Sequence, residues 1–159
     1  MPDRVRKVPT PPAARALCSL ARIDYEDTFV AETDRAQDLT AEEWARRIIE
    51  ESPARFRVSA PATWFALGLR HGLPWSSENI LGWPVRRSEP DFVLLGARSR
   101  TGMPAELLIK READSILFAT FIQHGSPVMR RVWSLVERPH QEIVPRLLGR
   151  GVRAEDPAS

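Results

Sequence analysis

The chain has 159 residues, of which 43% are hydrophobic and 28% are charged, and its formal net charge is +2. This composition is typical of a soluble globular protein, and the length fits a single domain with a real core. No apolar run is long enough to span a membrane, and no secretory signal pattern opens the chain. Cys18 is the one cysteine, which excludes an internal disulfide. We therefore expect a cytoplasmic protein.

Arginine dominates the basic residues. Of the 23 basic side chains, only Lys7 and Lys110 are lysines, and acidic residues are interspersed among the arginines. The paired arginines at 46–47, 86–87 and 130–131 fall on separate predicted elements, and no zinc-finger or RNP-like aromatic motif accompanies them. We interpret this pattern as an ordinary solvated surface and predict no nucleic-acid partner.

Residues 1–22 differ in composition from the rest of the chain. They combine four prolines with several basic residues, which disfavours packed structure. We predict a flexible arm over residues 1–22, a domain over residues 23–152 and a loose tail over residues 153–159.

In the first half of the domain, the sequence predicts one strand and two short helices. Residues 23–33 are rich in aromatic and β-branched side chains, which favours a strand. Thr40 and Glu43 form a capping box that predicts the start of a helix, and this helix should end before Pro53. A second short helical region is expected over residues 59–72.

A meander of strands is predicted next, over residues 80–87, 92–99, 105–111 and 116–123. Gly82 and Pro84 interrupt the first of these, which indicates a sheet edge or a bulge. The last is almost continuously apolar, as expected for a central strand. Because the turns between these segments are short, neighbouring strands should run antiparallel.

Residues 126–150 predict one long C-terminal helix. Ser126 can cap its first turn, and apolar residues recur with helical spacing along one side. Pro139 and Pro145 lie inside this pattern, and each removes a backbone hydrogen bond. We therefore expect a kink near Arg138 or a short break there.

The order of these elements predicts an α+β fold. A curved antiparallel sheet should wrap a long C-terminal helix, with two short helices after the first strand. That order and the closing run FATFIQHGSPVMRRVWSLVERPHQEIVPRLLGRG resemble the START-like (SRPBCC) helix-grip superfamily, and within it a bacterial branch. The superfamily includes polyketide cyclases, aromatases and lipid-transfer domains, and the resemblance covers residues 23–152. It implies an apolar pocket between the sheet and the C-terminal helix, and no fixed set of catalytic residues.

A set of apolar side chains should line that pocket if the apolar phase of each segment faces inward. They are Phe92, Leu94, Leu107, Ile109, Phe118, Thr120, Ile122, Val132 and Val136. The alternative is that they are simply the core. Arg98 and Arg111 share the phase of these residues and are candidate polar anchors for a ligand, although either could instead extend into solvent.

The three histidines, His71, His124 and His140, have the spacing of no known metal site. No phosphate loop, dinucleotide fingerprint or G-x-S-x-G motif is present, so we predict neither a metal nor a cofactor. His124 follows the last strand and is a candidate proton donor or acceptor, with a backbone-bonded turn residue as the alternative. His140 follows Pro139, where we expect a structural hydrogen bond.

Three hypotheses about function follow. The first is a protein that binds or carries an apolar small molecule of lipid, polyketide or isoprenoid type. The second is an enzyme of the cyclase or aromatase type that uses Arg98, Arg111 or His124 for acid–base work. The third is an interaction module in which the N-terminal arm or the arginine-rich helix docks a partner. A homodimer is left open, and no membrane span is expected.

Overall fold

The computed structural model describes residues 5–73 and 75–153. Its strands are β1 (Val5–Lys7), β2 (Tyr25–Glu32), β3 (Leu69–Arg70), β4 (Asn79–Ile80), β5 (Trp83–Ser88), β6 (Phe92–Ser99), β7 (Ala105–Arg111) and β8 (Ser115–Ile122). Its helices are α1 (Pro12–Arg15), the 3-10 turn η1 (Ala36–Asp38), α2 (Ala41–Ile49), α3 (Ala54–Ala66) and α4 (Pro127–Arg153).

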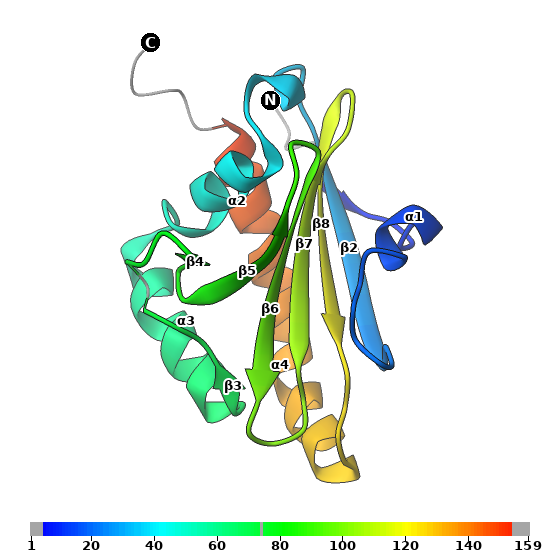
Figure 1. The fold of residues 1–159 in the computed structure, drawn as a ribbon, viewed down its shortest axis with the longest axis vertical. Coiled ribbons are helices and arrows are strands. Elements are labelled where there is room, and N and C mark those ends of the chain that lie inside the picture. The colour runs from blue at the N-terminus through cyan, green and yellow to red at the C-terminus, as the bar shows by residue number, and fades with distance from the viewer. Residues whose placement is uncertain (1–4, 74, 154–159) are drawn as a thin grey trace.

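Within the described part of the chain, eight strands form one antiparallel sheet in the order β1-β2-β8-β7-β6-β5-β4, and β3 pairs with β6. The long helix α4 crosses one face of this sheet, and α2 packs against α4, β6 and β7 (Figure 1). The predicted α+β helix-grip architecture, with two short helices between the first predicted strand and the meander, is confirmed.

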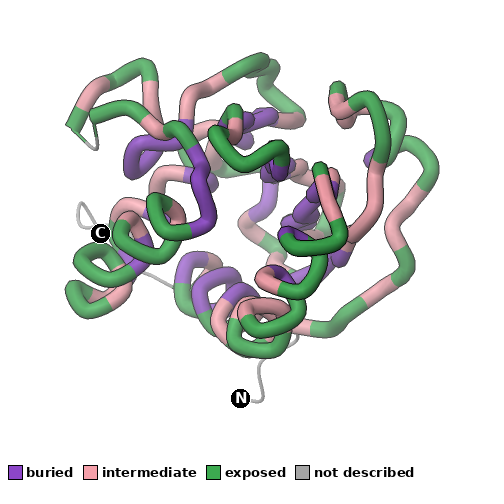
Figure 2. Tube along the Cα trace, turned by 90° about the horizontal axis from the view of Figure 1, so that it is seen from below, coloured by how far each residue is buried: buried purple, intermediate pink, exposed green. Residues whose placement is uncertain are grey.

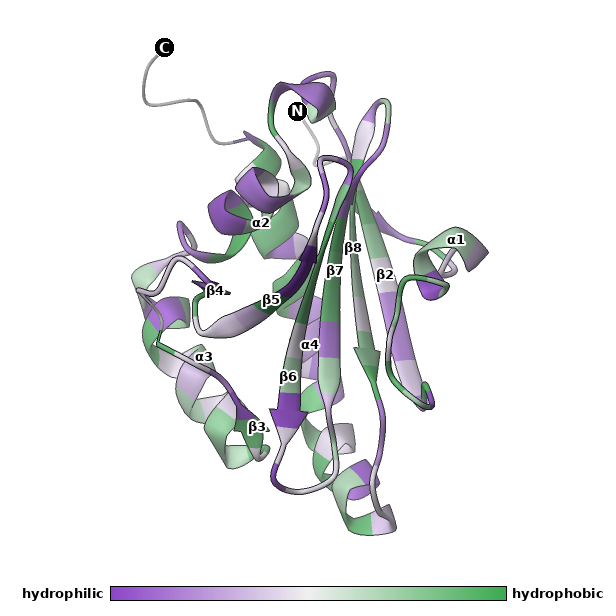
Figure 3. Ribbon diagram, in the orientation of Figure 1, coloured by the Kyte–Doolittle hydropathy of each residue, from purple (hydrophilic) through white to green (hydrophobic). Residues whose placement is uncertain are grey.

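The main core lies between the sheet and the helices α2 and α4. Side chains alternate along each strand, so Phe29 of β2, Ile109 of β7 and Phe118 of β8 all point to this side. Seen along the sheet, the buried residues follow the strands and the inward sides of the helices (Figure 2). The central strands are largely hydrophobic, with a hydrophilic stretch on β2 (Figure 3).

Residues 5–22, for which the sequence predicts a flexible arm, lie against the sheet. Val5–Lys7 pairs with β2, and the backbone amide of Val8 donates to the carbonyl of Thr28 at 2.9 Å. The chain then crosses the face of the sheet opposite α4, where it covers a second apolar cluster (Figure 1). The buried members of that cluster are Ala14, Val30, Leu94, Leu108, Leu117, Ala119 and Phe121. The sheet is therefore covered on both faces.

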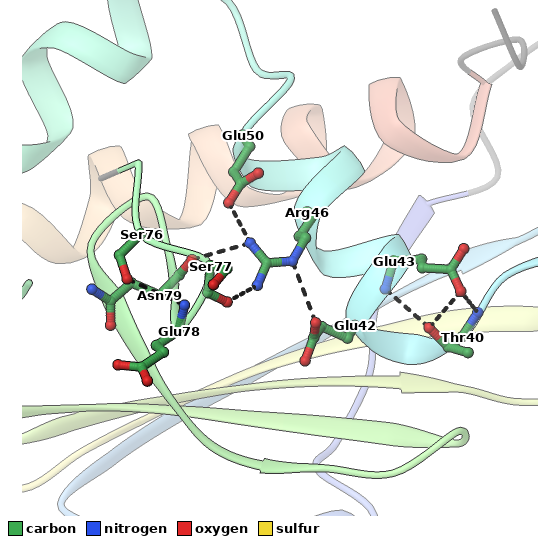
Figure 4. A network of polar contacts seen from close by, with 9 residues as sticks. All are labelled: Thr40, Glu42, Glu43, Arg46, Glu50, Ser76, Ser77, Glu78 and Asn79. Atoms are coloured by element: carbon green, nitrogen blue, oxygen red, sulfur yellow. Dashed lines mark hydrogen bonds and ion pairs between the residues drawn. The ribbon is translucent and has the colours of Figure 1, made fainter. Parts of the chain in front are cut away.

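Helix α2 begins at the predicted capping box and holds a neighbouring loop. The Thr40 hydroxyl accepts the Glu43 amide at 3.2 Å, and the Glu43 carboxylate lies within 3.4 Å of the Thr40 amide. One turn later, Arg46 donates to the carbonyl of Ser77 at 2.6 Å and to that of Asn79 at 3.1 Å (Figure 4). This arginine joins α2 to the segment that leads into β4 and β5.

Helix α3 begins earlier than the sequence predicts. It starts at Ala54, directly after Pro53, and it includes Pro61 in its interior. The expected start at residue 59 was wrong because Pro61 was interpreted as a first-turn proline. The helix packs on β3 at one end.

Helix α4 is continuous from Pro127 to Arg153, with Pro139 and Pro145 inside it. The alternative of a short break near Arg138 was therefore wrong. The helix continues past the predicted end at Arg150 and includes Arg153, the first residue of the predicted tail. The rest of that tail, residues 154–159, and residues 1–4 of the predicted arm lie outside the described residues.

Candidate ligand-binding site

A cavity of about 550 Å³ lies between the sheet, α3 and α4. Its walls come from β7 and β8 on one side and from the two helices on the other. The sheet contributes Ala105, Leu107, Phe118, Thr120 and Ile122, α3 contributes Phe56, Ala60, Thr63 and Trp64, and α4 contributes Trp133, Val136, His140, Ile143 and Leu147. Ligand pockets in proteins span roughly 300–1,000 Å³, so the cavity can hold a small organic molecule.

Aromatic rings make up much of the helical side of the cavity. Trp64 of α3 meets Phe56 and Trp83 edge to face, with ring centroids 6.2 Å and 5.5 Å apart. On α4, Trp133 packs against Tyr25 of β2 at 5.0 Å. Rings fixed in this way present large apolar surfaces whose shape changes little.

The structure brings together part of the residue set predicted for the pocket. Leu107, Phe118, Thr120, Ile122 and Val136 line the cavity. Ile109 belongs to the same buried core and Val132 packs against it, although neither lines the cavity. The role of these residues in ligand binding stays a prediction.

Phe92 and Leu94 lie on the other face of the sheet, which corrects their predicted placement. Both pack in the cluster beneath the N-terminal segment, whereas Val93 and Leu95 face the main core. The phase of β6 was misread because its residues are apolar and buried on both sides. When a strand is apolar on both sides, its sequence does not show which side chains face the helices and which face away from them.

The polar candidates of the sequence do not enter the cavity. Arg98 is exposed at the end of β6. Arg111 donates to the Asp91 carboxylate and to the carbonyl of Leu39, each at 3.0 Å. The placement of both arginines in the pocket was therefore wrong.

His124 lies outside the cavity lining as well. Its backbone amide donates to the Asp24 carboxylate at 2.7 Å, as expected for a residue bonded in a turn. Burial lowers the pKa of its imidazole, so the ring stays neutral at physiological pH.

The cavity has a different polar group, the pair of His140 on α4 and Asp27 on β2. His140 lines the cavity, and its Nε2 lies 3.1 Å from Oδ2 of Asp27. The Asp27 side chain is fully buried, and its Oδ1 has no hydrogen-bond partner among the described residues. The expected structural bond of His140 to a freed helix carbonyl is replaced by this contact with a carboxylate.

Tyr25 completes the surroundings of Asp27. Its hydroxyl donates to Oδ2 of Asp27 at 2.6 Å and accepts from the side-chain amide of Gln141 at 2.9 Å. Burial, followed by the bond to Asp27, raises the pKa of the Tyr25 phenol well above its usual range. The phenol therefore remains a proton donor to the carboxylate.

Three further polar atoms in the cavity wall have unused bonding capacity. The Thr120 hydroxyl and the indole N–H groups of Trp83 and Trp133 are buried without a hydrogen-bond partner in the described ranges. Leaving such a group unsatisfied costs about 1–3 kcal/mol.

Sequence reasoning missed the Asp27–His140 pair because its members lie on elements far apart in the chain. One signal was available. In the strand predicted over residues 23–33, Asp27 shares its phase with Tyr25 and Phe29, which points a carboxylate toward the core. A buried carboxylate requires partners: the Tyr25 hydroxyl donates to it, and His140 lies 3.1 Å away.

Comparison with known proteins found one solved structure with weak similarity to this chain. No protein-family model matches the chain, and no curated protein matches it. The crystal structure of CalU16 from Micromonospora echinospora is similar over 99% of this chain and 87% of that chain, with 15% sequence identity and a TM-score of 0.33. None of the helices in residues 5–73 and 75–153 combines the length and apolar character that crossing a membrane requires.

Proposed function

We propose that the protein binds an apolar small molecule, of lipid, polyketide or isoprenoid type, in the cavity between the sheet and α4. The cavity itself carries this proposal: about 550 Å³ of space, open to solvent on one side, is lined mostly by apolar and aromatic side chains. Protein interiors are packed about as densely as organic crystals, and the walls of a void lose their dispersion contacts. A bound ligand restores those contacts.

The position of the cavity supports the same proposal. It lies between the sheet and the C-terminal helix, where the resemblance of residues 23–152 to the START-like superfamily implies a pocket. Apolar residues make up most of its wall, and polar side chains among the lining residues include Thr120, His140 and the arginines Arg55, Arg146 and Arg150. Such a distribution orients a mostly apolar ligand through a small number of hydrogen bonds.

Fluorescence titration with N-phenyl-1-naphthylamine, an uncharged apolar probe, tests this function. Trp64, Trp83 and Trp133 line the cavity, so a probe bound there quenches tryptophan emission by energy transfer. We expect saturable binding of one probe per chain. Absence of saturable binding would refute the proposed function.

Two substitutions on α3 locate the binding site. Ala60 lines the cavity and is 6% exposed, whereas Ala62 is on the same helix and exposed. Ala60→Phe fills the cavity and should weaken probe binding at least about tenfold, or roughly 1.4 kcal/mol. Ala62→Phe is the matched control and should bind as the original chain does. Equal affinity in both variants would place the probe elsewhere, and thermal unfolding verifies that both are folded.

A further inference from the structure

We infer that His140 and Asp27 form an acid–base site in the cavity, and that the protein removes a proton from the carbon next to a carbonyl group in an apolar ligand. This inference rests on the proposed function, because the substrate must first occupy the cavity. It is carried by three observations: the 3.1 Å distance between His140 and Asp27, the burial of Asp27 and the unsatisfied donors beside them.

The His140 ring is held on several sides. Its Nε2 is 3.1 Å from Oδ2 of Asp27, and the ring meets Trp133 and Tyr25 edge to face at 5.4 Å and 6.4 Å. The contact is short but not aligned as a hydrogen bond, because Nε2 has no hydrogen-bond partner among the described residues. We assign the contact with Asp27 to Nε2 and the contact with a ligand to Nδ1, in the cavity that His140 lines. A general base requires this kind of fixed ring with one free nitrogen.

The buried Asp27 carboxylate is only partly satisfied: its Oδ2 accepts from the Tyr25 hydroxyl, and its Oδ1 has no hydrogen-bond partner in the described part of the chain. Its neighbours on the same face of β2 are Tyr25 and Phe29, and an apolar residue there would avoid the desolvation of a charge. Next to His140, however, a carboxylate fixes the orientation of the imidazole and stabilises the cation that forms when the ring takes a proton. Asp27 is therefore a positioning residue for His140.

Two unsatisfied hydrogen-bond donors lie beside the pair of Asp27 and His140. Thr120 pairs with Asp27 across β2 and β8, and the Thr120 hydroxyl has no partner among the described residues. Trp133, whose ring contacts His140, has an unpaired indole N–H. A carbonyl oxygen bound by these groups would be stabilised as it gains negative charge.

The step balances without a further reagent. Neutral His140 takes a proton from the carbon next to the carbonyl through Nδ1, and the C–H electron pair becomes the C=C bond of an enolate. The carbonyl π pair moves to the oxygen, where Thr120 or Trp133 donates a hydrogen bond. Imidazolium then returns the proton to the same carbon or to another carbon of the ligand, which gives exchange or isomerisation with no oxidant or reductant.

Hydrogen–deuterium exchange of 2-tetralone in D₂O tests the inference. This apolar ketone carries acidic protons next to its carbonyl, and mass spectrometry follows their replacement by deuterium. General-base catalysis contributes about 10²–10⁴-fold, so the original chain should exchange the ketone at least about 100-fold faster than His140→Gln. His124→Gln is the matched control, because His124 lies outside the cavity lining, and it should retain the full rate.

The Asp27→Asn variant tests whether Asp27 positions His140 for catalysis or only supports the fold. We expect its maximal exchange rate to fall at least about tenfold while its affinity for 2-tetralone, measured by tryptophan quenching, stays within twofold of the original. Thr120→Val removes the hydroxyl and keeps the shape, so it should also exchange more slowly. If circular dichroism shows that His140→Gln is unfolded, the exchange rates of Asp27→Asn and Thr120→Val decide the test.

The outcomes distinguish this inference from the proposed function. If 2-tetralone binds and exchanges equally fast with the original chain and with the folded His140, Asp27 and Thr120 variants, the acid–base site is refuted and the binding function stands. If N-phenyl-1-naphthylamine binds but 2-tetralone does not, the carbonyl class of substrate is wrong and the inference falls. If neither compound binds, the proposed function fails.

Discussion

The carboxylate of Glu106 on β7 accepts the backbone amide of Ser19 at 2.7 Å and also bonds the Ser19 hydroxyl. Glu106 is 3% exposed and lies on the face of the sheet opposite the cavity. One buried side chain therefore fastens the N-terminal segment to the back of the sheet.

Glu106→Gln should loosen that segment. The amide keeps the shape of the side chain but removes the charge and one acceptor, so the free energy of unfolding should fall by about 1.5–3 kcal/mol, as for hydrogen bonds to charged groups. Amide exchange measured by mass spectrometry should accelerate over residues 8–22. Glu89→Gln is the control, because Glu89 is exposed, and should change neither quantity. Unaltered exchange in residues 8–22 of Glu106→Gln would contradict the role of Glu106.

Cys18 should react slowly with iodoacetamide. Burial, with a further contribution from the Glu106 carboxylate, raises the pKa of its thiol from an ordinary value of 9.0 to about 12. At pH 8 the folded chain then carries about 10³-fold less thiolate than an ordinary cysteine. The same chain in guanidinium chloride is the control and should be alkylated at the ordinary rate. Equal rates in the two states would show that the thiol is not protected.

The same shift predicts a loss of stability at high pH. The folded state holds the Cys18 proton to a higher pH than the unfolded state, in which the thiol has its ordinary pKa of 9.0. Its contribution to stability is therefore complete below pH 9 and is lost as the pH rises toward 12. The raised pKa of Tyr25 acts in the same direction. Denaturant unfolding should show a steeper decline from pH 9 upward in the original chain than in Cys18→Ser.

Arg46→Ala should release the segment that precedes β5. Arg46 bonds two carbonyls of that segment and the Glu50 carboxylate, the last at 2.7 Å. Losing these contacts should lower the free energy of unfolding by about 1–3 kcal/mol and accelerate amide exchange over residues 76–80. Arg138→Ala is the control, because Arg138 is 90% exposed and pairs with Glu142 on the helix surface, and should cost under about 0.5 kcal/mol. If Arg46→Ala also lowered the free energy of unfolding by less than about 0.5 kcal/mol, other contacts would hold residues 76–80 in place.

Pro145→Ala should stabilise α4. Pro145 has no amide to donate to the carbonyl four residues earlier, that of Gln141. Alanine supplies that donor, and the gain, partly offset by a more flexible unfolded chain, should be about 1–2 kcal/mol in a denaturant titration. Pro127→Ala changes the first residue of the helix, where proline costs nothing, and should not stabilise. A less stable Pro145→Ala would show that the helix packs in a shape that only proline allows.

The sequence predicted the strands and helices correctly where turn residues, caps and hydrophobic pattern indicated the same element. The predicted strands 92–99 and 105–111 have the bounds of β6 and β7, because turn residues bracket both segments. The Thr40 capping box marked the start of α2 for the same reason. These signals depend on neighbours in the chain and not on tertiary contacts.

The site was readable only in part, because it depends on what covers each face of the sheet. The N-terminal segment buries the back of β6, which made both of its faces apolar and hid the phase of Phe92 and Leu94. The Asp27–His140 contact joins the second strand to the last helix, and no spacing rule links two such positions. Both facts appear only when distant segments are packed together.

Short strands close the sheet at each end. β1 has three residues, with Arg6 and Lys7 exposed, and β4 has two residues. Such brief edges, of which β1 is also charged, give other chains almost no template for strand addition, so they protect against edge-to-edge aggregation. Removing β1 would unpair Phe29, Val30 and Ala31 at the edge of the longer strand β2 and give other chains a template for strand addition.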